Sequence, residues 1–238
     1  TIAIHPFDII TIGGDDVLLI VPAHAAMRIA IAIGQQFGRE MTAFVQKEMG
    51  RARTLSMSGG VVIAEHHTPI RTLYDLAKQL QDEAKKLDGG GLDFLVLKSS
   101  DMLDSQVEAV REKYPYIIQG GDRRTSKDLR LLARPYTYSQ LATLWQELGS
   151  LKSGDNLSNS QMHLLAQSLL DGRLSATLFF EYQQKRNRAA YNDLRRLLTT
   201  LQATGQDHPL PWEKISGEDY SYQTALWDLA ELYDFIPG

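Results

Sequence analysis

The chain has 238 residues, a net charge of −4 at pH 7, 43% hydrophobic and 23% charged residues, and no cysteine. This composition is typical of an ordinary soluble globular protein, and the length suffices for one large or two small domains. It excludes disulfides and thiolate metal sites, and it gives no global sign of nucleic-acid binding. No apolar stretch is long enough to span a membrane and no secretory leader opens the sequence, so we expect a cytoplasmic protein.

Residues 8–21, with the sequence DIITIGGDDVLLIV, have the pattern of a β-hairpin in which two apolar runs flank Gly-Gly-Asp-Asp. Both runs are short and rich in β-branched residues, which favours strands. Gly13 and Gly14 can adopt positive φ, as tight hairpin turns require. The pattern predicts a buried hairpin that carries Asp15 and Asp16 side by side at its tip.

A helix and a further strand are expected after the hairpin. Pro22 ends the second strand, and residues 23–49 have a helical pattern, first nearly all apolar and then mixed. Gly34 and Gly38 lie within this segment and disfavour a single unbroken helix. Residues 55–64, LSMSGGVVIA, predict a strand whose two adjacent glycines permit another group to approach the backbone closely.

A second helix and strand complete the first half of the chain. Thr68 is the expected N-cap, and Pro69 takes the first helical position. Apolar residues then keep helical spacing at Ile70, Leu73, Leu76, Ala77, Leu80, Ala84 and Leu87. Glycines end this helix, and residues 92–97, LDFLVL, predict a short strand.

The second half of the chain is expected to be helical. A stretch rich in Gly, Asp, Arg and Ser, residues 119–128, precedes a region without a convincing strand. Apolar spacing there predicts four helices, marked by Leu141 to Leu148, Met162 to Leu169, Leu174 to Leu201 and Tyr222 to Tyr233. We therefore predict an α+β part with helices on one face of the sheet, residues 1–134, and an all-α helical bundle, residues 135–238.

The adjacent carboxylates of the hairpin suggest a metal site. Two carboxylates at one turn repel each other unless a positive charge lies beside them. Mg²⁺ and Mn²⁺ prefer oxygen ligands and keep coordination positions open for phosphate, so two ions could support nucleotidyl transfer. The simpler alternative is a solvated turn, because Gly and Asp are common turn residues.

A second Gly-Gly-Asp in the same chain serves as an internal comparison. It lies in IIQGGDRR, residues 117–124, where a single acid, Asp122, is followed by two arginines instead of a returning strand. We interpret Asp122 as a loop residue. Only the first copy lies between two matched strands, which favours a functional reading of Asp15 and Asp16.

Three segments carry a resemblance to a known family. IGGDDVLLIVPAHAAMRIA, LSMSGGVVIAEHHTPIRTLYDLAKQLQDEAKKL and LDFLVLKSS resemble the second palm domain in the large subunit of type III CRISPR effector complexes, the Cas-ten protein of the Cmr and Csm systems. The likeness covers roughly residues 8–100. Residues 135–238 are similar to the C-terminal helical domain of that family in position and helicity.

The resemblance implies a fold and an activity. The fold would be a partial palm sheet of the ferredoxin-like, nucleotide-cyclase-like kind. In this family the palm uses Mg²⁺ or Mn²⁺ to convert ATP into cyclic oligoadenylate when the complex holds target RNA, as part of antiviral defence. Asp15 and Asp16 would be the catalytic metal ligands, and Gly13, Gly14, Ser58 and Lys98 the nucleotide-binding residues. Partners would be the other subunits of the ribonucleoprotein, with guide and target RNA contacted indirectly.

The sequence also departs from the family pattern. A palm of this kind takes a further metal-ligating acid from a strand upstream of the hairpin, and only seven residues precede Asp8. We therefore expect little turnover from residues 1–238 alone. Two alternatives remain: a diguanylate cyclase of the GGDEF type, disfavoured by Val17 where that family has an aromatic residue, and a non-catalytic scaffold domain.

Other chemistry-bearing residues have simpler explanations. Glu65, His66 and His67 are consecutive, so they would point to opposite faces of a strand and converge poorly on a metal. Asp101 and Asp104 are expected at a helix start. The basic stretch that contains Lys185, Arg186, Arg188, Arg195 and Arg196 is expected to be a solvated helix face, with contact to RNA or an acidic subunit as the alternative. Trp145, Trp212 and Trp227 are expected in the core.

Overall fold

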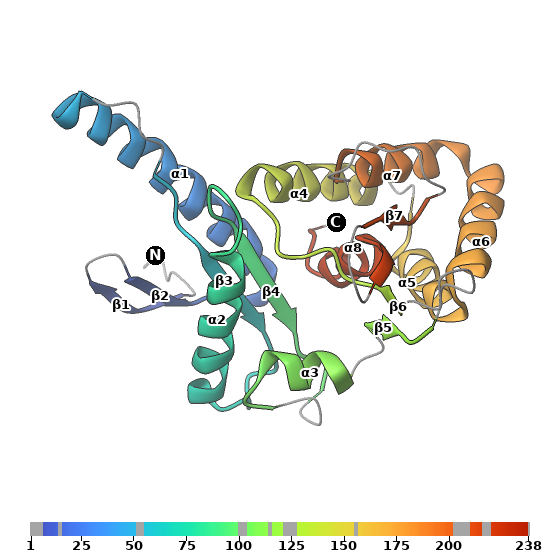
Figure 1. Ribbon diagram of the computed structural model, residues 1–238, viewed down its shortest axis with the longest axis horizontal. Helices are drawn as coiled ribbons and strands as arrows, with labels where there is room; N and C mark the ends of the chain where they lie inside the picture. Colours follow the sequence, from blue (N-terminus) through green and yellow to red (C-terminus); the bar gives the residue numbers. More distant parts are fainter. Residues whose placement is uncertain are drawn as a thin grey trace, which may run out of the picture.

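The protein is known from a computed structural model, which describes residues 7–13, 16–50, 55–99, 104–113, 116–120, 128–154, 157–201, 210–215 and 220–237. Two pairs of strands and two long helices form one side of the molecule, and a group of helices forms the other (Figure 1). This arrangement confirms the α+β fold class expected from the sequence.

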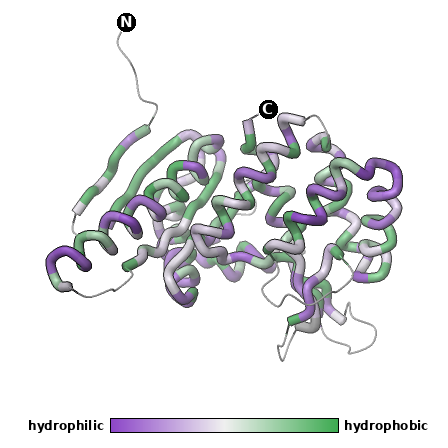
Figure 2. Tube along the Cα trace, turned by 90° about the horizontal axis from the view of Figure 1, so that it is seen from above, coloured by the Kyte–Doolittle hydropathy of each residue, from purple (hydrophilic) through white to green (hydrophobic). Residues whose placement is uncertain are grey.

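The N-terminal hairpin consists of β1 (Asp8–Gly13) and β2 (Asp16–Ile20), which are antiparallel. Gly13 pairs with Asp16, so residues 14 and 15 connect the strands. The predicted hairpin is confirmed, but it is not buried. Ile12 is 67% exposed, and Ile9 and Ile10 are also exposed. The hairpin lies along one side of the molecule (Figure 2). Most of its hydrophobic side chains are exposed, and Leu18 and Leu19 are half-buried.

Helix α1 (Ala23–Met49) is a single unbroken helix despite its two glycines. A Cβ atom on Gly34 would lie 2.1 Å from the Tyr138 ring, which belongs to α4 (Tyr138–Ser153). The missing side chain therefore lets the two helices pack closely. The helix predicted over residues 23–49 is confirmed. The two glycines do not interrupt it, because the packing of α1 against α4 outweighs the low helix propensity of glycine.

Strands β3 (Gly59–Ile63) and β4 (Leu92–Val96) are parallel neighbours, joined by α2 (Ile70–Ala84). The helix begins one residue after the expected position, so Pro69 and not Thr68 is its N-cap residue, and no side-chain hydrogen bond caps it. The close approach predicted at the strand glycines is made by this helix. A Cβ atom on Gly60 would lie 2.0 Å from the Ala77 carbonyl oxygen, so only glycine fits there.

Helices cover both faces of the β3–β4 pair. Val62 and Leu95 pack with Leu76 and Leu80 of α2, whereas the alternate residues Val61, Ile63 and Phe94 join a core that includes Met27 and Ile31 of α1. The expectation of helices on one face only is therefore wrong. Alternation along each strand places apolar side chains on both faces, and both must be covered.

The remaining elements are α3 (Val107–Lys113), β5 (Ile117–Ile118), β6 (Asp128–Arg130), α4, α5 (Asn159–Ser168), a 3₁₀ turn (Leu169–Asp171), α6 (Arg173–Arg186), α7 (Arg188–Leu201), β7 (Glu213–Lys214), β8 (Tyr220–Gln223) and α8 (Leu226–Tyr233). Two helix predictions are wrong in extent. The helix expected over 174–201 is divided at Asn187, whose φ of −134° is not helical. The segment from Tyr222 begins in a strand.

The second half of the chain also contains strands, contrary to expectation. β7 and β8 form a sheet with β5 and β6 in the order β5-β6-β8-β7, and the pairing of β6 with β8 is parallel. These strands are too short to show a periodic pattern in the sequence, so they form only because distant segments pair with one another in the fold. One hydrophobic core includes Phe94, Leu129 and Leu226 and thus runs through both halves. The domain division at residue 134 stays a prediction.

Candidate metal and nucleotide site

The tip of the hairpin is the candidate metal site. Asp16 is the first residue of β2 and its side chain is exposed, while Gly14 and Asp15 lie outside the described residues. Within the described part of the chain, Asp16 has no ion pair with a cationic side chain. An exposed carboxylate is a hard oxygen ligand, so its chemistry fits a divalent cation.

The backbone at the tip leaves room for a ligand. A Cβ atom added to Gly13 would meet nothing within 4 Å. The register of the hairpin places Gly13 directly opposite Asp16, at the last pair before the turn. A phosphate group could therefore approach Gly13 and the Asp16 carboxylate from the same open side.

Ser58 and Lys98 do not lie together. Ser58 precedes β3 and Lys98 follows β4, and because these strands are parallel and in register the two residues flank opposite ends of the pair. In this register Ser58 is level with Gly91, so a rise of seven residues separates it from Lys98, about 23 Å along the strands. The Ser58 carbonyl oxygen accepts a hydrogen bond from the Gln81 side chain at 3.2 Å, whereas Lys98 is exposed. One bound nucleotide could contact only one of them at its phosphates.

The two strand glycines beside Ser58 serve packing. A Cβ atom on Gly59 would lie 2.8 Å from Leu92, and the equivalent atom on Gly60 would meet α2. The groups that approach the backbone closely at these glycines are therefore Leu92 and helix α2 of the protein itself.

The other candidate metal ligands form no cluster. His66 and His67 are exposed, and their ring centroids are 3.7 Å apart. In the described ranges, no group of three or more His, Asp or Glu side chains could hold a metal ion. Asp104 accepts hydrogen bonds from the backbone N–H groups of Ser105 and Gln106 just before α3, as expected for a helix start. Asp101 and Asp122 lie outside the described residues.

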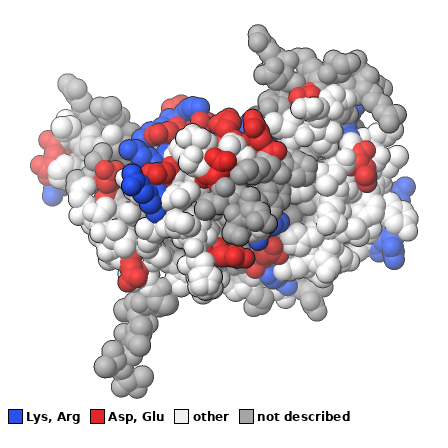
Figure 3. All heavy atoms as spheres, turned by 90° about the horizontal axis from the view of Figure 1, so that it is seen from below, with Lys and Arg blue, Asp and Glu red and all other residues white. Residues whose placement is uncertain are grey.

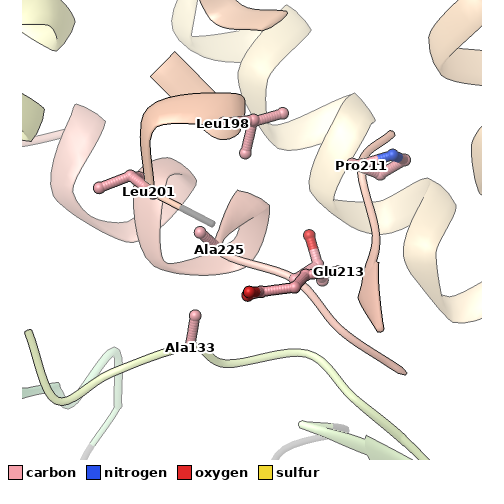
Figure 4. A pocket seen from close by; sticks show the side chains of 7 residues that line it. Ala133, Leu198, Leu201, Pro211, Glu213 and Ala225 are labelled. Carbon is pink, nitrogen blue, oxygen red and sulfur yellow. The ribbon is translucent and has the colours of Figure 1, made fainter. Parts of the chain in front are cut away.

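Hollows elsewhere in the structure do not suit a nucleotide. One hollow, between β7, α7 and the segment around Ala133, has a volume of about 10 Å³, about enough for a single water molecule (Figure 4). An open groove of about 240 Å³ lies between α1 and α4 and is lined mainly by apolar atoms and by Trp145 and Arg28. Neither includes a residue expected at the site.

Two buried ionic groups escaped the sequence analysis. Asp93 on β4 is completely buried, and Arg111 on α3 donates hydrogen bonds to both of its carboxylate oxygens at 2.9 and 3.0 Å. Arg134 is also completely buried, and it lies beside Asp228 and Glu231 of α8. A sequence signal for these groups exists: an acidic residue lies inside an apolar run. Asp93 lies in LDFLVL, and Asp228 and Glu231 lie in LWDLAELY.

The basic stretch and the tryptophans mostly agree with expectation. Arg196 pairs with Glu147 at 3.0 Å and with Asp193 at 3.1 Å, and Arg195 lies 3.7 Å from Glu181. These side chains are exposed and ion-paired, as on a solvated helix face. Trp212 and Trp227 are buried, and Trp145 packs partly buried against the core.

An acid-bearing hairpin, a long helix and a parallel β–α–β unit define the class of protein, a palm of the nucleotidyltransferase-like kind. Residues 2–92 match the family described as Cas10/Cmr2, second palm domain. This match supports the assignment of the chain to the large subunit of a type III CRISPR effector complex. No curated protein matches the chain.

Two further statements follow for the whole chain. The family match implies membership of a CRISPR effector complex. Within the described residues, no helix combines the length and hydrophobicity that a membrane span requires.

Proposed function

We propose that the palm of this chain converts ATP into cyclic oligoadenylate when the effector complex holds target RNA. The observation that carries the proposal is that Gly13 and Asp16, the first and last residues of the GGDD sequence, face each other at the ends of β1 and β2, within the segment that matches the palm family. The exposed Asp16 and the open space at Gly13 support it, because a metal-bound triphosphate needs both a carboxylate and room.

The chemistry follows from the charges involved. Asp15 and Asp16 would hold Mg²⁺ or Mn²⁺, which favours ionisation of the attacking ribose hydroxyl and neutralises charge on the departing pyrophosphate. The chain itself would orient ATP by leaving Gly13 and Gly14 without side chains at the turn. Transfer then forms a phosphodiester bond at the α-phosphorus and releases pyrophosphate.

Ser58 and Lys98 remain candidate nucleotide-binding residues in the proposal, but they cannot both contact the same nucleotide. Ser58 and Lys98 flank opposite ends of β3 and β4, so only one of them can contact a nucleotide held at the hairpin. Lys98 offers an exposed ammonium group to phosphate, and Ser58 offers a hydroxyl. Substituting each by alanine separately should weaken ATP binding in one variant only.

The test uses the assembled complex with target RNA, ATP and Mn²⁺ or Mg²⁺. Replacing Asp15 and Asp16 together by asparagine should lower oligoadenylate formation by about 100-fold or more, because metal coordination contributes several kcal/mol to the transition state. The matched control is Asp8→Asn, at the far end of the same hairpin and exposed. This control should keep wild-type activity.

The outcomes separate the alternatives. Oligoadenylate that depends on Asp15 and Asp16 supports the proposal, and loss of Mn²⁺ binding in the double variant, measured by electron paramagnetic resonance, places the metal there. Cyclic di-GMP from GTP would indicate a diguanylate cyclase. No nucleotide product from the wild-type complex would indicate a scaffold, and undiminished oligoadenylate from the double variant would remove the carboxylates from the mechanism.

A further inference from the structure

The hairpin that carries the candidate carboxylates continues directly into α1. Within the described residues, β1 and β2 pair only with each other and form a sheet separate from β3 and β4. Only Val21 and Pro22 lie between the end of β2 and the start of α1. The Pro22 carbonyl oxygen accepts a hydrogen bond from the Ala25 N–H at 2.9 Å, which ties this junction to the helix. The position of α1 therefore constrains the position of the hairpin.

The first turns of α1 share a core with Phe94 of β4. Met27 and Ile31 of α1 are buried in the same hydrophobic cluster as the Phe94 ring. Phe94 lies opposite Val61 in the register of β3 and β4, so both side chains project from the face that α1 covers. Because protein interiors are close-packed and transmit strain, a displacement of Phe94 would also displace α1.

Phe94 is held by the buried guanidinium of Arg134. Arg134 Nη1 donates to the Phe94 carbonyl oxygen at 2.7 Å, and the guanidinium carbon lies 4.3 Å from the centre of the Phe94 ring. Arg134 Nη2 donates to Glu231 of α8 at 2.8 Å. β4 lies on the side of the strand pair that is nearer the C-terminal helices (Figure 1). One side chain thus joins the backbone and the ring of a β4 residue to α8.

We propose that Arg134 is a positioning residue for the hairpin carboxylates. By fixing Phe94 relative to α8, it fixes the packing of α1 on the strand pair and, through α1, the pose of β1 and β2. The effect on catalysis rests on the proposed function, whereas the effect on the hairpin does not. A displacement of about 1 Å at a reacting centre can cost about 100-fold in rate, so a distant residue of this kind can control turnover.

A second buried arginine provides a matched control. Arg111 of α3 donates two hydrogen bonds to Asp93, the residue before Phe94. Consecutive strand residues project to opposite faces, so this pair lies on the face of β4 away from α1. Both arginines bind neighbouring residues of one strand, but only Arg134 acts on the side that leads to the hairpin.

The first test measures the hairpin position with two spin labels in the full chain, which contains no cysteine of its own. Ile12→Cys labels the hairpin, where the side chain is 67% exposed. Lys78→Cys labels the exposed side of α2, on the face of the molecule where acidic and basic side chains are mixed (Figure 3). Double electron–electron resonance then gives the distribution of distances between the labels.

Arg134→Lys should at least double the width of this distribution. Lysine keeps the positive charge, but without the planar fork it cannot hold the Phe94 carbonyl oxygen and Glu231 together. Arg111→Lys should keep the wild-type width. Glu231→Gln is a milder second variant that removes one charge and keeps an acceptor, and it should also widen the distribution. If Arg134→Lys does not fold, Glu231→Gln decides the test; an unchanged width in the folded variants would overturn the proposal.

The second test follows catalysis in the assembled complex with target RNA, ATP and Mn²⁺. Arg134→Lys should lower kcat for oligoadenylate about tenfold or more. Mn²⁺ affinity, measured by electron paramagnetic resonance, should change less than twofold, because Asp15 and Asp16 are still present. Arg111→Lys should stay within twofold of wild type in both measurements.

The outcomes of the two tests are distinguishable. Wild-type kcat in Arg134→Lys, together with a widened distance distribution, would overturn the role of Arg134 in catalysis. A wild-type complex that makes no nucleotide product would overturn the proposed function and that catalytic role with it. The distance measurement would still decide whether Arg134 positions the hairpin.

Discussion

Arg134 shows how one buried charge is compensated. Its Nη1 donates to the Phe94 carbonyl oxygen at 2.7 Å, its Nη2 donates to Glu231 at 2.8 Å, and its Nε lies 3.2 Å from Asp228. Burial by itself lowers the pKa of Arg134, but attraction to Glu231 and Asp228 raises it above its ordinary value. The guanidinium therefore stays charged and links β4 to α8.

Neighbouring hydroxyl groups complete this ionic cluster. Tyr136 donates to Asp228 at 2.7 Å and Tyr116 donates to Glu231 at 2.8 Å. The Arg134 guanidinium also lies 4.3 Å from the centre of the Phe94 ring. Removing the arginine would leave two carboxylates buried without a cation, which is costly in a low-dielectric interior.

We expect Arg134→Met to lower the free energy of unfolding by about 3–5 kcal/mol, because it leaves the carboxylates of Asp228 and Glu231 uncompensated. Urea denaturation followed by circular dichroism measures the change. Arg28→Met, on an exposed face of α1, is the control and should stay within about 0.5 kcal/mol of wild type. A loss below about 1 kcal/mol for Arg134→Met would show that the cluster does not carry this stability.

At the scale of elements, close helix packing decides where glycine is required. Gly34 lies against the Tyr138 ring, whereas a Cβ atom on Gly38 would meet only the Leu55 carbonyl oxygen, at 3.6 Å. Both residues lie inside α1 and appear equivalent in the sequence. The structure distinguishes them because only Gly34 faces α4.

This difference gives a matched pair of substitutions. Gly34→Ala should destabilise the protein by about 1–3 kcal/mol, since the new methyl group must displace the Tyr138 ring. Gly38→Ala should instead stabilise it by about 0.5–1 kcal/mol through improved helix propensity. Thermal and urea unfolding of both variants check the signs. Equal effects would contradict the packing of α1 on α4.

The elements also show the limits of pattern reading. The hairpin, α1, α2, β3 and β4 follow from long apolar runs and turn residues, and all were predicted with ends within a few residues. β7 and β8 have two and four residues, and they form by pairing: β8 pairs with β6 across the fold, and β7 pairs with β8. The break at Asn187 likewise follows no apolar pattern, because Leu174 to Leu201 reads as one helical run.

At the scale of the whole molecule, one core joins the palm to the helical part. Tyr116, Leu129 and Leu131 are buried with residues of α8, and the backbone N–H of Ala133 donates to Asp228 at 2.8 Å. The predicted boundary at residue 134 therefore falls within a packed region. Cutting the chain there would expose apolar side chains and leave Arg134 without its carboxylates.

We expect a fragment of residues 1–134 to lack a cooperative thermal unfolding transition, because its core residues lose their partners in α4 and α8. Differential scanning calorimetry of the fragment and of the full chain makes the comparison. The full chain should show a distinct transition. A fragment that unfolds cooperatively at the temperature of the full chain would establish residues 1–134 as an independent domain.

The sequence by itself determined the acidic hairpin and the order of helices and strands in the palm, because these depend on local turn chemistry and on apolar runs of adjacent residues. Its motifs also carry the resemblance to the palm family. Only the tertiary structure decided that the hairpin is exposed, that Ser58 and Lys98 lie apart, that α2 fills the space beside Gly60, and that Arg134 pairs with α8. Each of these depends on which distant segments meet, and contact between residues far apart in the chain leaves no periodic pattern in the sequence.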